Sequence, residues 1–523
     1  MNEALLAHLK EKHGIEKPTA IQELFWKSAI DKNGCMSDSS DVILKAQTGS
    51  GKTLAFLLPI LSTLFSMTNL ITASNNFKEE RSSIGTVCII LSPTRELAQQ
   101  IHTVLAELCL QAKKVPRWIV PGLLIGGEKK KSEKSRVRKG CHILVATPGR
   151  LLDHLENTEA LNVSRLKWVV LDEADRLLDL GFEKKVKKIM SMIEEKQSKK
   201  NDERKFNEFD ARRSMVILCS ATVDKRVLEM AGRPLIKPLS ISADESNCAV
   251  IPDSLEQYYV KVDPRTRFIA LISLLKGLNK KTIVFFSCCD VVDYFHALFI
   301  SLCKVENLLK LHGNLSALER TEQFSRFTKQ SNSLLFCTDV AARGLDLKDV
   351  PCIIQFDAPC DLKDYVHRIG RTARVGLHGE SYLFLMESEL PYLELLSNTT
   401  QSALKMEEKK ISISPDFDEK KIVESVSEDE KLSALSRTAF TSFVRAYATH
   451  TSSERHIFHI RKLHLGHLAK GFGLKAAPSA LCAKQGKEKR KAGEESGDYL
   501  EKKRMKQSVL KKGISHNEFS SGI

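Results

Sequence analysis

The stretch V-I-L-K-A-Q-T-G-S-G-K-T at residues 42–53 has the residue types of a phosphate-binding loop between a buried strand and a helix. Gly49 and Gly51 would let backbone N–H groups converge on phosphate oxygens at a helix N-terminus. The Lys52 ammonium would reach the β- and γ-phosphates, and the Thr53 hydroxyl would bind Mg²⁺. A surface turn that happens to contain Gly-Lys-Thr is the alternative, but the strand and helix context favours a phosphate site.

The sequence D-E-A-D at residues 172–175 directly follows the apolar run W-V-V-L. Acidic residues at the carboxyl end of a parallel strand face the same crevice as a phosphate loop. Asp172 could then hold Mg²⁺, partly through water, and Glu173 could polarise a water for attack on the γ-phosphate. An isolated acidic pair is more often a solvated turn or a helix cap. Together with Lys52 and Thr53, the pair favours hydrolysis of a nucleoside triphosphate.

Apolar runs of strand length alternate along the chain with amphipathic helical patterns, which is typical of parallel sheets covered by helices. The expected strands are 42–45, 86–92, 142–147, 168–172 and 215–222, followed by a second series at 282–287, 308–313, 333–339, 352–357 and 380–385. Two series favour two α/β domains joined near residues 244–256. Polar insertions at about 67–86 and 195–213 are expected to be solvated loops or mobile helices.

The composition constrains the partners and the compartment. The chain has 523 residues, a net charge of +15 and 13 cysteines. The charge indicates a polyanionic partner such as nucleic acid. The cysteines are scattered in apolar runs, as expected of small buried side chains in a reducing compartment. The sequence contains no signal peptide pattern and no apolar run near the roughly 20 residues of a membrane span, so we expect a soluble intracellular protein.

Short motifs also occur along the chain in a fixed order. They are P-T-A-I-Q (18–22), A-Q-T-G-S-G-K-T (46–53), P-T-R-E-L (93–97), G-G (126–127), T-P-G-R (147–150), D-E-A-D (172–175), S-A-T (220–222), I-V-F-F-S (283–287), T-D-V-A-A-R-G-L-D (338–346) and H-R-I-G-R-T-A-R (367–374). In this order they resemble the DEAD-box RNA helicases over about residues 5–395. The resemblance implies an α/β fold with two tandem RecA-like parallel-sheet domains that close over ATP and single-stranded RNA.

The expected domain organisation has four parts. The resemblance implies a first RecA-like domain at 1–245 and a second at 246–395. Helical apolar spacing predicts a helical C-terminal extension at 396–475, and a charged composition with few apolar residues predicts a basic disordered tail at 476–523.

The resemblance also assigns roles in ATP binding and hydrolysis. The implied nucleotide-binding residues are Thr19, Gln22, Ala46, Gln47, Thr48, Gly49, Ser50, Gly51, Lys52, Thr53 and Asp346, with Gln22 on the adenine and Asp346 on the ribose. The implied catalytic residues are Lys52, Asp172, Glu173, Arg371 and Arg374. The two arginines would be arginine fingers, which contribute about 10³–10⁵ in rate in other phosphoryl-transfer enzymes. Ser220 and Thr222 would couple the nucleotide state to domain closure.

The implied RNA-binding residues are Thr94, Arg95, Gly127, Thr147, Gly149, Arg150, Arg320 and Thr338. Such residues contact phosphates and 2′-hydroxyls rather than base edges, so little sequence preference is expected.

The chain departs from the family pattern at a few positions. Leu5 occupies the place of an aromatic residue that stacks on adenine, so either the stack is weakened or the start of the chain is incomplete. Ala46 and Ala373 replace glycines, and Ala317 replaces a glutamine that precedes Arg320. The change at Ala373 is not expected to move the arginine fingers, whereas the change at Ala317 is expected to lower RNA affinity in the second domain.

The extension at 396–475 and the stretch 126–140 resemble a nucleolar subset of the family that acts in assembly of the large ribosomal subunit. The extension interleaves aromatic and basic residues, which could bind RNA or pack on the second domain, and both interpretations stay open. Its histidines at 450, 456, 459, 464 and 467 are expected to be surface or hydrogen-bonded residues. Basic clusters at 487–491 and 502–506 resemble a nuclear localisation signal, with a merely solubilising tail as the alternative.

The sequence therefore predicts a monomeric nuclear and nucleolar RNA helicase that uses ATP and Mg²⁺. Its predicted partners are pre-ribosomal RNA and pre-ribosomal proteins, without a membrane. An RNA clamp gated by ATP without productive unwinding is the alternative.

Overall fold

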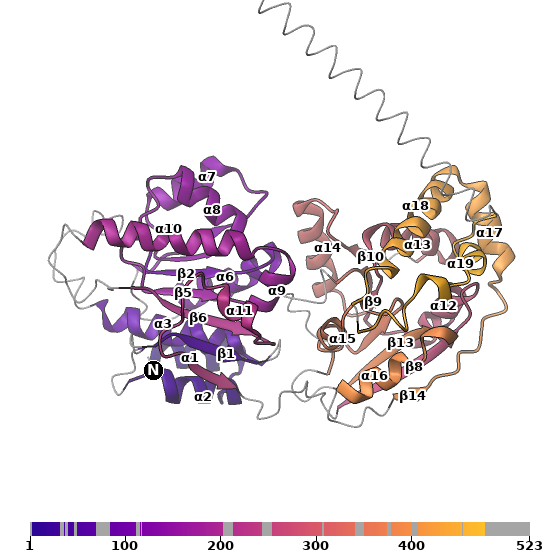
Figure 1. The fold of residues 1–523 in the computed structure, drawn as a ribbon, viewed down its shortest axis with the longest axis horizontal. Helices are drawn as coiled ribbons and strands as arrows, with labels where there is room; N and C mark the ends of the chain where they lie inside the picture. Colours follow the sequence, from indigo (N-terminus) through magenta and orange to yellow (C-terminus); the bar gives the residue numbers. More distant parts are fainter. Residues whose placement is uncertain are drawn as a thin grey trace, which may run out of the picture.

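The computed structural model describes residues 3–31, 36, 40–46, 50–68, 84–110, 116, 118–201, 213–242, 254–305, 308–339, 350–373, 378–399, 406–451 and 453–475. These residues form two seven-stranded sheets, and every strand pair in them is parallel. The two sheets lie in separate lobes (Figure 1). The predicted fold class, α/β with two tandem parallel sheets, is confirmed.

The first sheet is covered by helices on both faces. Its strands are β1 (Val42–Lys45), β2 (Cys88–Leu91), β3 (Pro121–Leu124), β4 (Ile143–Ala146), β5 (Trp168–Leu171), β6 (Met215–Ser220) and β7 (Leu239–Ser242). The helices are α1 (Glu3–His13), α2 (Ala20–Ala29), α3 (Lys52–Ser66), α6 (Arg95–Leu110), α7 (Lys130–Arg138), α8 (Pro148–Asn157), α9 (Ala174–Asp179), α10 (Glu183–Asn201) and α11 (Lys225–Glu229). Strand residues alternate between two cores: Val42 and Leu44 join α1, α2, α3 and α6, whereas Ile43 joins α7 to α11.

The second sheet has the same design. Its strands are β8 (Leu255–Val262), β9 (Thr282–Phe285), β10 (Leu308–Leu311), β11 (Leu334–Cys337), β12 (Cys352–Gln355), β13 (Gly379–Met386) and β14 (Met406–Glu408). The helices are α12 (Arg267–Leu278), α13 (Cys289–Cys303), α14 (Ala317–Lys329), α15 (Leu362–Ile369), α16 (Tyr392–Thr399), α17 (Glu419–Glu428), α18 (Glu430–Tyr447) and α19 (Leu465–Gly471), with single turns η1 (Glu387–Glu389) and η2 (Ile460–Lys462).

Strand order brings the predicted motifs to one edge of each sheet. In the first sheet the order is β3-β4-β2-β5-β6-β1-β7, so the strands before D-E-A-D, S-A-T and the phosphate loop are neighbours. All strands run in the same direction, and their carboxyl ends therefore lie along a single edge. This edge is the place where open α/β sheets bind ligands.

Every strand expected from the apolar runs is present, but four strands were not predicted. They are β3, β7, β8 and β14. Strand β3 begins with Pro-Gly, a pair that disfavours a strand on propensity. Strand β8, L-E-Q-Y-Y-V-K-V, begins at the end of the region 244–256 that was expected to join the domains, and it has no continuous apolar run. The insertion at 195–213 begins as helix, because α10 extends to Asn201. Residues 69–83 of the insertion at 67–86 and the whole tail at 476–523 lie outside the described residues.

The extension packs on the second sheet. Phe440, Phe443 and Phe472 belong to the same buried core as α12 and α13. The Tyr294 hydroxyl of α13 donates a hydrogen bond of 2.7 Å to the Phe472 carbonyl, and its ring stacks on the Phe472 ring. For α17, α18 and α19, the packing interpretation of this segment is therefore confirmed. Within the part of the chain that the structure describes, no helix is both long and apolar enough to cross a membrane.

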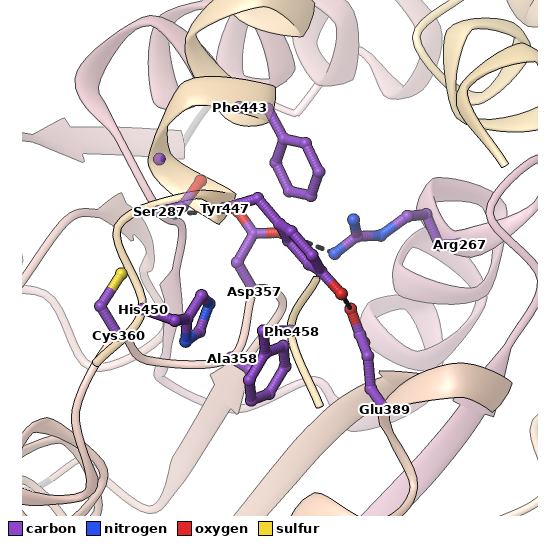
Figure 2. A pocket seen from close by; sticks show the side chains of 11 residues that line it. Arg267, Ser287, Asp357, Ala358, Cys360, Glu389, Phe443, Tyr447, His450 and Phe458 are labelled. Carbon is purple, nitrogen blue, oxygen red and sulfur yellow. Dashed lines mark hydrogen bonds and ion pairs between the residues drawn. The ribbon is translucent and has the colours of Figure 1, made fainter. Parts of the chain in front are cut away.

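Polar side chains are buried where α18 meets the second sheet (Figure 2). Arg267 donates to Asp357 at 2.5 Å, and the Tyr447 hydroxyl donates to Glu389 at 2.9 Å. They surround a cavity of about 20 Å³, which has room for about one water molecule. Burial raises the pKa of Glu389 to about 7, although the Met386 N–H, Arg267 and Tyr447 favour its charged form.

We predict that the free energy of unfolding of Glu389→Gln falls less than that of the parent as the pH rises from 5 to 8. The folded pKa of Glu389 lies above its ordinary value, so this group stabilises the fold below pH 4.5, and that stabilisation is lost as the pH rises through about 7. Chemical denaturation should show a fall in unfolding free energy from pH 5 to pH 8 that is smaller in the variant by about 2 kcal/mol. Glu387→Gln, which changes an exposed carboxylate on the same turn, is the control. Equal pH dependence in Glu389→Gln and the parent would contradict the assignment.

Candidate active site

The P-T-A-I-Q segment donates side-chain hydrogen bonds to the phosphate loop. The Gln22 amide donates to the Gly51 carbonyl at 2.9 Å, and the Thr19 hydroxyl donates to the Ser50 carbonyl at 2.8 Å. Gly51 has φ +92°, and a Cβ there would lie 2.5 Å from the Gln22 amide nitrogen. Only glycine therefore fits at the N-cap of α3.

Lys52 begins α3 and is buried. Its ammonium donates a hydrogen bond of 2.5 Å to the Ala46 carbonyl and lies in the field of Asp172. Thr53 follows it, half-buried, in the first turn of the helix. A buried ammonium at a helix N-terminus is suited to binding phosphate. Gln47, Thr48 and Gly49, the remaining predicted residues of the loop, lie outside the described residues.

The predicted catalytic carboxylates follow β5 directly. Burial and then the charge of Glu173 raise the pKa of Asp172 to about 7, while Lys52 opposes this shift. Glu173 has φ +47°, a left-handed conformation that is strained for a residue with a side chain. Its Oε2 atom is buried and has no hydrogen-bond partner. Two adjacent buried carboxylates, one of them with an unsatisfied oxygen, fit a divalent cation.

The predicted coupling residues contact the acidic motif. The Asp175 carboxylate accepts hydrogen bonds from the Thr222 N–H at 3.2 Å and the Thr222 hydroxyl at 3.3 Å. The Ser220 hydroxyl accepts a hydrogen bond from the Asp175 N–H at 3.3 Å. A displacement at S-A-T would therefore be transmitted to D-E-A-D through Asp175, which the sequence did not identify.

A cavity of about 270 Å³ lies beside Gln22. It is lined by Leu6, Ala7, Leu9, Lys10, Ile15, Glu16, Lys17, Pro18, Gln22, Trp26, Leu54 and Leu58. Its apolar residues and the Gln22 amide suit a flat heteroaromatic base. Leu5, which takes the place of the family's aromatic residue, is fully buried in the core, and the neighbouring Leu6 lines the cavity instead.

The predicted RNA-binding residues of the first domain lie beyond the carboxyl ends of β2, β3 and β4. Thr94 caps the start of α6 by accepting a hydrogen bond from the Leu97 N–H at 3.3 Å. Arg95 lies so close to Gly126 that a Cβ there would be 2.8 Å from its Nη2 atom. Gly127 follows Gly126 after β3, Thr147 is the N-cap of α8, and Gly149 lies in the first turn of that helix.

Arg150 takes part in a buried network that the sequence did not predict. Its Nε atom lies 2.7 Å from Glu133, and its Nη2 atom donates to the Glu128 carbonyl at 2.6 Å. Glu133 is fully buried and also contacts His154 at 3.1 Å and accepts from the Ile125 N–H at 3.3 Å. The spacing of Glu133 and Val137 on the buried side of α7 was the only signal.

In the second domain, Thr338 and Arg371 are both buried. The Thr338 hydroxyl has no hydrogen-bond partner, and the Arg371 Nε atom donates to the His367 carbonyl at 3.2 Å. Arg368, which was not predicted, makes a bidentate contact with Asp339: its Nε and Nη2 atoms donate to the two carboxylate oxygens at 2.6 and 2.9 Å. Asp346 and Arg374 lie outside the described residues.

Two further predicted positions have specific geometry. Ala373 has φ +50°, so the conformation that favours glycine is kept although alanine occupies it.

Arg320 of α14 pairs with Glu96 of α6 at 2.7 Å, which links the two lobes. Glu96 belongs to P-T-R-E-L, so the ion pair connects two segments predicted to bind RNA.

The phosphate loop, the buried carboxylates and the paired parallel sheets define a two-domain nucleoside triphosphatase. The family models agree in chain order: DEAD/DEAH box helicase matches residues 19–231, Helicase conserved C-terminal domain matches 266–376, and the ATP-dependent rRNA helicase SPB4-like C-terminal extension matches 429–480. The chain belongs to the DEAD-box ATP-dependent RNA helicases.

Similar proteins support this membership over nearly the whole chain. The Schizosaccharomyces pombe protein named ATP-dependent RNA helicase dbp7 is 39% identical, and the match covers 94% of this chain and 74% of that protein. The Homo sapiens protein named ATP-dependent DNA helicase DDX31 is 35% identical over 93% of this chain and 62% of that protein. The structure of Mss116p bound to ssRNA and AMP-PNP matches with a TM-score of 0.73 and 26% identity, covering 90% of this chain and 88% of that one.

We predict that Lys52→Ala and Glu173→Gln separate nucleotide binding from hydrolysis. In the predicted roles, Lys52 would neutralise phosphate already in the ground state, whereas Glu173 would act in the transition state. Titration with a fluorescent ATP analogue should show lost binding in Lys52→Ala and retained binding in Glu173→Gln, with hydrolysis lost in both. Lys27→Ala, which changes an exposed lysine of α2, is the control. Unchanged ATP affinity in Lys52→Ala would contradict the role of Lys52.

Proposed function

We propose that the chain couples hydrolysis of ATP with Mg²⁺ to the unwinding of short RNA duplexes, or to the remodelling of RNA–protein complexes, during assembly of the large ribosomal subunit. The observation that carries the proposal is the cluster of buried charges after β1 and β5, where Lys52 lies in the field of Asp172. The match of residues 429–480 to the SPB4-like extension of an rRNA helicase supports pre-ribosomal RNA as the substrate.

In the proposed chemistry, Lys52 and the backbone N–H groups at the start of α3 bind the phosphates. Thr53 and Asp172 hold Mg²⁺, partly through water, and the ion supplies positive charge to the phosphate oxygens. Glu173, held by its strained backbone, positions and deprotonates the attacking water. Gln22 contacts the adenine in the cavity beside it, and Asp346 contacts the ribose from the second domain.

The RNA would bind across both lobes through its phosphates and 2′-hydroxyls. The proposed residues of the first domain, from Thr94 to Arg150, lie beyond the carboxyl ends of the first sheet. Arg320 of α14 and Thr338, which follows β11, belong to the second lobe. The Mss116p structure, which contains ssRNA, supports this arrangement by its similarity over both domains. Contacts of this kind predict weak sequence preference.

We propose further that the protein acts as a monomer in the nucleolus, alongside pre-ribosomal proteins. The nucleolar location is supported by the match of residues 429–480 to the C-terminal extension of an rRNA helicase. The basic clusters at 487–491 and 502–506 would direct import into the nucleus.

Strand displacement distinguishes the helicase from the ATP-gated clamp. We expect the full chain to release the short strand of an RNA duplex with a single-stranded overhang when ATP and Mg²⁺ are present. A DNA duplex of the same sequence is the second substrate, because the human relative is named a DNA helicase. ATP-dependent RNA binding without displacement would favour the clamp, and displacement of DNA alone would contradict the RNA substrate.

We predict that Arg371→Lys and Arg374→Lys each abolish hydrolysis stimulated by RNA and leave RNA binding intact. A lysine keeps the charge but lacks the planar fork that stabilises a transferring phosphoryl group, a contribution of about 10³–10⁵ in rate. Steady-state ATP turnover with and without RNA is the measurement, and Arg437→Lys, an exposed arginine of α18, is the control. Full turnover in both finger variants would refute their role.

A further inference from the structure

A cluster of metal-binding side chains lies outside the active site, between α1 and α6. His8 and His13 of α1 and Glu107 of α6 place their ligand atoms within 4.8 Å of one another. The Nε2 atoms of His8 and His13 lie 3.6 and 3.1 Å from the same oxygen of Glu107. We propose that these residues bind a divalent transition metal ion such as Zn²⁺, which fastens α1 to the first domain.

The buried histidine is the strongest observation. His8 is 6% exposed, and its Nε2 atom has no hydrogen-bond partner. A buried polar atom without a partner destabilises a fold, so native structures usually satisfy it. An ion pair between His13 and Glu107 accounts for the 3.1 Å contact, but His8 Nε2, 3.6 Å from the same oxygen, still has no hydrogen bond. A metal ion would satisfy all three side chains at once.

The separations fit a metal site. A tetrahedral Zn²⁺ ion bound at about 2.0–2.2 Å keeps its ligand atoms roughly 3.3–3.6 Å apart. The separations from Glu107 are 3.1 and 3.6 Å, and all three ligand atoms lie within 4.8 Å of one another, so side-chain adjustments of about 1 Å would bring them into this range. Two imidazoles and one carboxylate are a ligand set for Zn²⁺ and similar ions, whereas Mg²⁺ and Ca²⁺ prefer oxygen ligands alone.

The cluster lies on the helix that lines the proposed adenine cavity. His13 ends α1, and the P-T-A-I-Q segment begins a few residues later at Pro18. The same helix contributes Leu6, Leu9 and Lys10 to the cavity beside Gln22. A metal ion that fixes α1 would therefore fix one wall of that cavity and tighten ATP binding. This consequence, but not the metal site itself, rests on the proposed role of the cavity in binding adenine.

Zn²⁺ titration of the full chain tests the site. The protein is first treated with a chelator and then titrated in excess Mg²⁺ without nucleotide, with thermal unfolding and calorimetry as readouts. We expect one tight site that raises the unfolding temperature and binds at least about tenfold more weakly in His13→Gln and in Glu107→Gln. His13 is 34% exposed, so its replacement should not prevent folding.

The control variant is His467→Gln, which changes one histidine of the stacked pair His464–His467 in the extension. Equal Zn²⁺ affinity in the parent, His13→Gln and Glu107→Gln would overturn the site, as would loss of the tight site in His467→Gln. Co²⁺ provides a second check, because a band characteristic of thiolate ligands would assign the metal to cysteine and also overturn it.

Nucleotide affinity tests the link separately. ATP should bind more tightly to the parent with Zn²⁺ than without it, and by reciprocity ATP should tighten Zn²⁺ binding by the same factor. His13→Gln should lose this difference. An ATP affinity that does not respond to Zn²⁺ in a protein that binds Zn²⁺ would overturn the link. A failure to bind ATP at all would instead count against the proposed function.

Discussion

The arrangement of the active site depends on burying opposite charges at the carboxyl ends of neighbouring parallel strands. Lys52 follows β1, Asp172 follows β5, and β6 lies between these strands with Ser220 at its end. An unpaired buried charge is strongly unfavourable, so each group requires the others nearby. Burial and the charge of Glu173 nevertheless raise the pKa of Asp172 to about 7, and Lys52 opposes this shift only in part. The site is thus poised to gain stability from a bound cation and phosphate.

The second domain depends on its extension in a different way. Side chains of α17, α18 and α19 complete the same apolar core as β9, β12 and β13, so the extension is part of the domain rather than an appendage. Its aromatic side chains, whose type suggested RNA binding, are buried in this core. Removing the segment would uncover Tyr294 and Phe295, whose rings contact Phe472. It would also uncover Arg267, which lies over the Phe443 ring and donates to Asp357. Any RNA-binding role must therefore come from exposed basic residues of these helices.

The sequence predicted the sheets and motifs because short apolar runs and phosphate-loop chemistry are local signals. Strand β8 was missed because polar residues interrupt its apolar run, and β3 was missed because its first residues, Pro121 and Gly122, disfavour strands. Glu133, Asp175 and Arg368 were missed for another reason. Their roles come from partners that the fold brings together, as when Thr222 reaches Asp175 from β6. Residue type and local spacing carry no record of such contacts.

Two of the three arginines proposed to bind RNA, Arg150 and Arg320, already have carboxylate partners, and this affects how RNA would bind. Arg150 contacts Glu133, and Arg320 contacts Glu96. A phosphate that binds either arginine replaces one charge-assisted contact by another. The net gain in binding free energy is therefore smaller than for a free guanidinium. The displaced glutamates would need new partners or water. Glu133, which is fully buried, would keep its contact with His154. Exchange at Arg320 would also break the link between α14 and α6. RNA binding and rearrangement of the two lobes would then be a single event.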